Sequence, residues 1–157
     1  MSNNSIYKRL VREIKDIHRE YLKCSLQLDN DKYIIILTIQ NKKVNYEKKQ
    51  IKFIFNESYP FKCPSLYINN RNYLNMLCSS YMYINLYSNN QEKCMCNNSR
   101  LCHGNWSPAI KLMDLIDEYI KNYNIMLKAI QKRYLKIILK EKNMIGNEYY
   151  EMIEKYL

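Results

Sequence analysis

Apolar residues recur every three or four positions near the start of the chain: Ile6, Leu10, Ile14 and Ile17. This spacing follows one face of an α-helix, so the pattern predicts an amphipathic helix over residues 5–17. Ser5 is the predicted N-cap, because its hydroxyl can accept a hydrogen bond from an orphan amide of the first turn. Basic residues fill the opposite face, which we expect to be solvated.

Three strand-like segments follow, at residues 24–28, 33–39 and 50–55. The second is nearly continuous and β-branched, which is typical of a strand buried on both faces. The third alternates, with Ile51, Phe53 and Phe55 on one face. Short polar turns join the three segments, so the pattern predicts an antiparallel meander.

The meander is predicted to end with a fourth strand at residues 66–68. Pro60 and Pro64 precede it and cannot donate hydrogen bonds to a sheet, so the segment between them must leave the sheet. Residues 70–105 are polar and Asn-rich, with one weak helical patch at 73–84. A long connection of this kind in a small domain is usually functional or disordered.

The last third of the chain has helical periodicity. Ser107 and Pro108 are predicted to cap and open a helix, whose apolar face includes Ala109, Met113, Ile116 and Ile120. A second helical pattern covers residues 124–142, Gly146 interrupts it, and 147–157 forms a last short helix. Together the elements predict one α+β domain over residues 1–157, with a core at 5–123 and a helical extension at 124–157.

The net charge of +10 is spread along the chain, and residues 61–109 carry only four basic residues. A nucleic-acid groove concentrates its charge in a stripe, so no nucleic-acid partner is expected. The longest uncharged apolar run, residues 33–39, is too short to span a bilayer, and no signal peptide is recognisable. We therefore expect no membrane partner, and a reducing location in the cytoplasm, the nucleus or both.

Three of the six cysteines lie close together in the polar connection: Cys94, Cys96 and Cys102, with His103 beside the last. Thiolate and imidazole ligands in this number are enough for one tetrahedral zinc ion. The same thiols could instead be nucleophiles, and a thiolate held by zinc would not be free to react. The two interpretations remain open at this stage.

The order of elements and three motifs resemble the catalytic domain of ubiquitin-conjugating enzymes. Residues 8–14 (KRLVREI) are similar to the family's first helix, residues 59–64 (YPFKCP) to its Tyr-Pro-Phe-x-x-Pro signature, and residues 106–109 (WSPA) to the opening of its second helix. The resemblance implies an N-terminal helix, a four-stranded antiparallel meander and C-terminal helices. It also implies a cysteine that accepts ubiquitin or a ubiquitin-like protein as a thioester from an activating enzyme. The thioester is then passed to a substrate lysine, with or without a ligase, and no cofactor is required.

The catalytic region departs from the family pattern. The family has a His-Pro-Asn signature before its cysteine and a Trp eight residues after it, whereas this sequence lacks the signature and has Asn98 eight residues before Trp106. Cys94, followed by a hydrophobic residue, is the first candidate nucleophile, with Cys102 and Cys96 as alternatives. Asn89 is the first candidate that would support the oxyanion, with Asn97 and Asn98 as alternatives.

The resemblance further implies a docking surface for the ligase and the activating enzyme, made of Lys8, Arg12, Phe61, Pro108 and Ala109. Because the His-Pro-Asn signature is missing, a second hypothesis is an inactive variant that acts as a ubiquitin-pathway binding module. A third is an interaction protein stabilised by zinc on Cys94, Cys96, Cys102 and His103. Cys24, Cys63 and Cys78 are expected to be small buried or incidental thiols.

Overall fold

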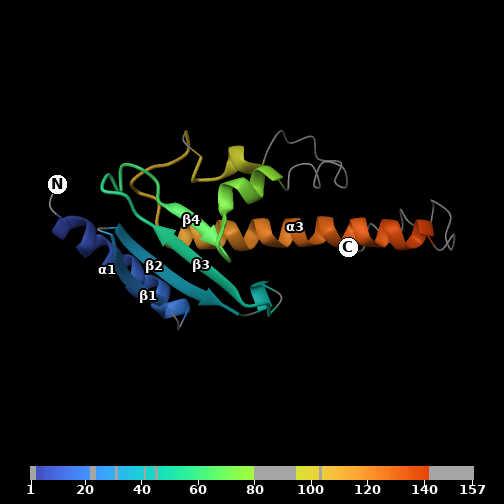
Figure 1. The fold of residues 1–157 in the computed structure, drawn as a ribbon, viewed down its shortest axis with the longest axis horizontal. Coiled ribbons are helices and arrows are strands. Elements are labelled where there is room, and N and C mark those ends of the chain that lie inside the picture. Colours follow the sequence, from blue (N-terminus) through green and yellow to red (C-terminus); the bar gives the residue numbers. More distant parts are fainter. Residues whose placement is uncertain are drawn as a thin grey trace.

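The computed structural model describes residues 3–21, 24–30, 32–40, 42–44, 46–79, 95–102 and 104–141. Its elements are α1 (Asn3–Glu20), β1 (Cys24–Asp29), β2 (Lys32–Ile39), η1 (Lys42–Val44), β3 (Lys49–Ile54), β4 (Ser65–Ile68), β5 (Arg71–Asn72), a helical stretch at 73–79, η2 (Met95–Asn98) and α3 (Leu112–Glu141) (Figure 1). The α+β class is confirmed, with the first helix and the four strands in the predicted order. A short fifth strand, β5, extends the predicted four-stranded sheet.

The sheet is an antiparallel meander with its strands in chain order. Pairing aligns apolar side chains across it: Ile35 lies opposite Phe53, and Phe53 lies opposite Leu66. All three are buried. A slip of one residue would turn this row toward the other face, so the apolar pattern fixes the register.

Helices α1 and α3 share one core cluster with this face of the sheet. Leu10 and Ile17 of α1 and Ile116 and Tyr119 of α3 are buried in that cluster. Figure 1 shows α3 running along the sheet and continuing well beyond it. Within the described ranges, no helix is both long enough and apolar enough to cross a bilayer.

Two details of the first helix differ from the prediction. The helix begins at Asn3, so Ser5 lies inside it and is not the N-cap. Arg9 is only partly exposed and does not belong to a solvated basic face. Its guanidinium donates hydrogen bonds to the hydroxyl of Tyr59 and to the carbonyl of Ile110, each at 3.2 Å. These acceptors lie 50 and 101 residues away, so helical periodicity could not reveal them.

The predicted opening of the second long helix is wrong. Ser107 starts a turn instead, in which its hydroxyl accepts a hydrogen bond from the amide of Ala109 at 3.3 Å. The helix α3 begins at Leu112, and the Leu112 amide donates to the carboxylate of Glu13 at 3.0 Å. An acceptor from α1 therefore caps α3, which is why the local sequence pointed to the wrong residue.

Helix α3 also differs from the prediction in its length. It runs without a break through the predicted boundary between residues 123 and 124, as one helix of 30 residues. Helical periodicity is continuous across that boundary, so the two predicted helical patterns form one helix. Gly146 and the predicted short helix at 147–157 lie outside the described residues.

Candidate functional site

Two turns that are distant in the sequence meet beside the sheet. One is the connection between β3 and β4, and the other precedes α3. The indole of Trp106 donates a hydrogen bond to the carbonyl of Pro60 at 2.8 Å, and its ring lies 6.3 Å from that of Tyr59 between centroids. The thiol of Cys63 points at the carbonyl of Leu101, 3.7 Å away. The two turns are therefore held together at two places, and we call this region the junction.

Helix α1 is the third part of the junction. Besides its two hydrogen bonds, Arg9 lies over the ring of Tyr59, 5.2 Å from the centroid, and forms an ion pair with Glu13 at 3.4 Å. Burial raises the pKa of the Glu13 carboxyl, while the Leu112 amide and the Arg9 charge oppose that rise. Burial also raises the pKa of Tyr59. The group is therefore a buried polar network that joins α1 to both turns.

The predicted docking residues lie on the outside of the junction. Lys8, Arg12, Phe61, Pro108 and Ala109 are all exposed, and 61% of Phe61 is accessible. On α1, Lys8 directly precedes Arg9 of the junction, and Arg12 follows Arg9 by about one turn. Phe61 follows Pro60, and Pro108 follows Trp106 by two residues; Pro60 and Trp106 are the two residues joined by the indole hydrogen bond. An exposed aromatic side chain such as Phe61 is of the kind that forms binding hot spots.

Cys102 is the candidate nucleophile that the structure places at the junction. Its thiol is half-buried and free, and it directly follows Leu101, whose side chain is buried. The Cys102 amide donates to the carbonyl of Ser99 at 3.0 Å, and its own carbonyl accepts from the amide of Asn105 at 2.8 Å. These bonds hold the backbone on both sides of the thiol in tight turns.

The segment that carries Cys102 is anchored to α3. The backbone amide of Arg100 donates to the carboxylate of Glu118, and the Arg100 side chain donates to the carbonyl of Asp114, both at 2.9 Å. Glu118 is one turn along the helix from Asp114, so Arg100 contacts two successive turns. The segment is therefore fixed relative to the helix that forms the core.

The other candidates fall partly outside the described residues, which include neither Cys94 nor Asn89. Cys96 is half-buried and disulfide-bonded, and it lies on η2. The proposed zinc ligand His103 also lies outside the described ranges. Among the residues that are described, no group of three or more His, Cys, Asp or Glu side chains is placed to hold a metal ion.

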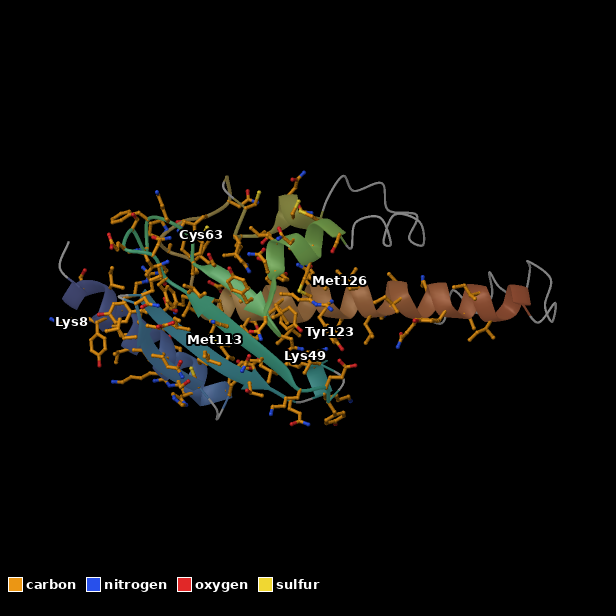
Figure 2. The ribbon with its side chains drawn as sticks, viewed as in Figure 1. Lys8, Lys49, Cys63, Met113, Tyr123 and Met126 are labelled. Carbon is orange, nitrogen blue, oxygen red and sulfur yellow. The ribbon has the colours of Figure 1, made fainter. Side chains whose placement is uncertain are left out.

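The remaining three cysteines differ in their surroundings. Burial raises the pKa of the Cys24 thiol to about 11, so it holds almost no thiolate at neutral pH. Cys63 is half-buried against the second turn, while Cys78 is exposed rather than buried. Figure 2 shows Cys63 on the connection between β3 and β4, away from the part of the sheet that carries Lys49.

Sequence reasoning missed the Arg9–Glu13–Tyr59 network. One local signal was available, because an acid four residues after a basic residue suits a helical ion pair. That signal does not show that the pair is buried, which depends on the two distant turns.

Comparison of the chain with protein-family models, with curated proteins and with solved structures finds no match.

Proposed function

We propose that this protein is a divergent ubiquitin-conjugating enzyme, which carries ubiquitin or a ubiquitin-like protein as a cysteine thioester. The observation that supports this proposal is the junction. The three segments that resemble the family are far apart in the sequence, yet Arg9 and Trp106 both contact the Tyr59-Pro60 turn. Motifs that arose independently of each other would have no reason to converge on one surface.

The proposed chemistry needs little more than an accessible thiolate. It attacks the carbonyl of the thioester on the activating enzyme, forms a new thioester and releases the thiol of that enzyme. A neutral lysine amine of the substrate then attacks the carbonyl, and the cysteine leaves as a thiolate. Cys94 is the first candidate for this role and Asn89 for the oxyanion donor, and Cys102 is the alternative that lies at the junction.

A binding module without thioester chemistry is the second candidate function. One observation favours it. All the predicted docking residues are exposed and none of them is a cysteine, so binding through them needs no reactive thiol: Lys8, Arg12, Phe61, Pro108 and Ala109. Such a module would bind ligase or activating enzyme through the same surface. The two functions therefore differ only in whether a thiol reacts.

A charging assay separates the two functions. The full chain is incubated with an activating enzyme, ATP and its ubiquitin-like protein, and a reductant-sensitive adduct is sought on gels. We expect an adduct that Cys94→Ser abolishes and that the matched control, Cys78→Ser at an exposed thiol, leaves unchanged. Loss with Cys102→Ser alone would move the nucleophile to Cys102. No adduct with ubiquitin or any ubiquitin-like protein would refute the enzyme, and zinc in the purified protein would favour the third hypothesis.

The docking surface is tested by binding. A ligase that accepts ubiquitin from this protein is titrated against wild type, Phe61→Ala and a control, Leu28→Ala. The Leu28 side chain on β1 is about as exposed as that of Phe61. Truncating a hot-spot aromatic residue is expected to raise the dissociation constant at least about tenfold, with no change for the control. Equal affinities for the two variants would remove Phe61 from the docking surface.

A further inference from the structure

The apolar face of α3 does not end where the sheet ends. Along the first half of the helix, Ile116 and Tyr119 are buried in the core. The same face continues at spacings of three or four residues past the sheet, where its side chains are exposed. We call these four residues the distal stripe: Ile130, Tyr134, Ile137 and Ile138, with 45%, 63%, 39% and 47% of their surfaces accessible.

The point at which α3 leaves the sheet is well defined. The ammonium of Lys49 lies over the ring of Tyr123, 4.6 Å from its centroid, and Figure 2 shows these two side chains beside Met126. Met126 and Ala129 are buried in a small cluster separate from the main core. Apolar burial therefore extends about one turn beyond the sheet, and the distal stripe begins directly after it.

The charge around the distal stripe restricts what can cover it. Residues 121–140 contain six basic residues and no acidic one. Two copies of this helix packed together would place like charges against each other, which disfavours self-association. The stripe also faces the side of α3 that the sheet occupies, so a flat lipid surface would meet the sheet first. An occupant that fits is a short, acidic, apolar segment.

The chain contains such a segment, at residues 147–157, outside the described residues. It carries three glutamates and one lysine, and its apolar positions Tyr149, Met152, Ile153 and Tyr156 have the spacing of helix-in-groove anchors. We propose that residues 147–157 cover the distal stripe. As a helix the segment would be about 16 Å long, against about 12 Å from the first to the last residue of the stripe.

The tether favours this contact over any partner in solution. Only five residues separate the end of α3 at Glu141 from the start of the segment, and Gly146 among them permits a reversal of the chain. A short linker of this kind gives an effective concentration in the millimolar range. The covering therefore needs only a modest intrinsic affinity, supplied by apolar contact and opposite charge.

The test compares Ile130→Asp with Ile125→Asp in the full chain. Ile125 is the matched control, because it is a 40% exposed isoleucine on the same helix, about 140° around the axis from Ile130. Hydrogen exchange of residues 147–157, followed by mass spectrometry, is the readout. We expect exchange in this segment to rise about tenfold or more with Ile130→Asp and to stay at the wild-type rate with Ile125→Asp.

A second variant tests the charge. Replacing Glu148, Glu151 and Glu154 with lysine should raise exchange in the segment, and high salt should raise exchange in the wild type as well. Exchange of residues 147–157 at the rate of an unstructured peptide in the wild type would overturn the proposal. So would equal effects of the two aspartate variants, a dimer in sedimentation that Ile130→Asp dissolves, or binding to phosphatidylserine vesicles that depends on the stripe.

Discussion

Replacing Glu13 should show how much of the stability depends on the contact between α1 and α3. The Glu13 side chain is buried, and its carboxylate accepts the Leu112 amide at 3.0 Å at the first residue of α3. It also pairs with Arg9 at 3.4 Å. Glu13→Ala would leave a helix-terminal amide without its acceptor and Arg9 without its counter-charge.

The expected loss follows from these contacts. A hydrogen bond to a charged group contributes about 1.5–3 kcal/mol, and an unpaired buried partner adds to the cost of removing it. We expect Glu13→Ala to lower the free energy of unfolding by about 2–4 kcal/mol, and Glu13→Gln, which keeps an oxygen acceptor, by about 1 kcal/mol. Urea unfolding followed by circular dichroism measures both. Glu57→Ala, at an exposed carboxylate, is the control and should stay within about 0.5 kcal/mol of wild type.

The pH dependence of the same variant tests the electrostatic reasoning. Burial raises the pKa of Glu13 above its ordinary value of 4.5, so the folded protein holds this proton more tightly than the unfolded chain. The pH-dependent part of the stability that Glu13 contributes is therefore fully present below pH 4.5 and is lost as the pH rises through the raised pKa. Wild type should lose stability relative to Glu13→Gln over that range. A relative gain with rising pH would mean that the Arg9 charge outweighs burial and would refute the argument.

Three further variants or treatments test other parts of the structure. Trp106→Phe removes the indole donor to Pro60 and should cost about 1 kcal/mol of stability in urea unfolding followed by circular dichroism. Tyr73→Phe removes a buried hydroxyl that forms two hydrogen bonds to α3 and should cost about 1–2 kcal/mol in the same assay. Iodoacetamide at pH 8 should alkylate exposed Cys78 long before Cys24, whose pKa is about 11, and similar rates by mass spectrometry would contradict that burial effect.

The strands were predictable because their signals are local and repeated. Phe53, for example, lies in an alternating run, and the row through Ile35, Phe53 and Leu66 is what the alternation requires of a sheet with one buried face. The same holds for Leu10 and Ile17 on α1, where each turn of the helix repeats the evidence. For α1 and the four predicted strands, element type and order could thus be obtained from periodicity, and their boundaries were correct to within a few residues.

The start of α3 depends in part on a residue that is distant in the sequence. Ser107-Pro108 has the local chemistry of a helix start, yet the chain first makes a turn whose free amide is satisfied by the Ser107 hydroxyl. The helix begins where a buried acceptor is available, and that acceptor is Glu13, 99 residues earlier. Asp114, whose carboxylate accepts from the Lys111 amide at 2.8 Å, marks the same start locally, whereas Glu13 lies outside any window of neighbouring residues.

The contacts of the junction could not be predicted from neighbouring residues either. The resemblance gave Phe61 and Pro108 as docking candidates, whereas the contacts that join their two turns could not be predicted from it. These contacts include hydrogen bonds from Arg9 and Trp106 to backbone carbonyls. Every residue has a backbone carbonyl, so the sequence does not show which residue accepts each bond. A change at Arg9, which itself belongs to the first of the three motifs, should therefore disturb the proposed docking surface through α1 while leaving the other two motifs in place. Ligase binding by Arg9→Met, compared with Arg12→Met on the exposed face, would distinguish a residue that positions the turns from one that contacts the partner.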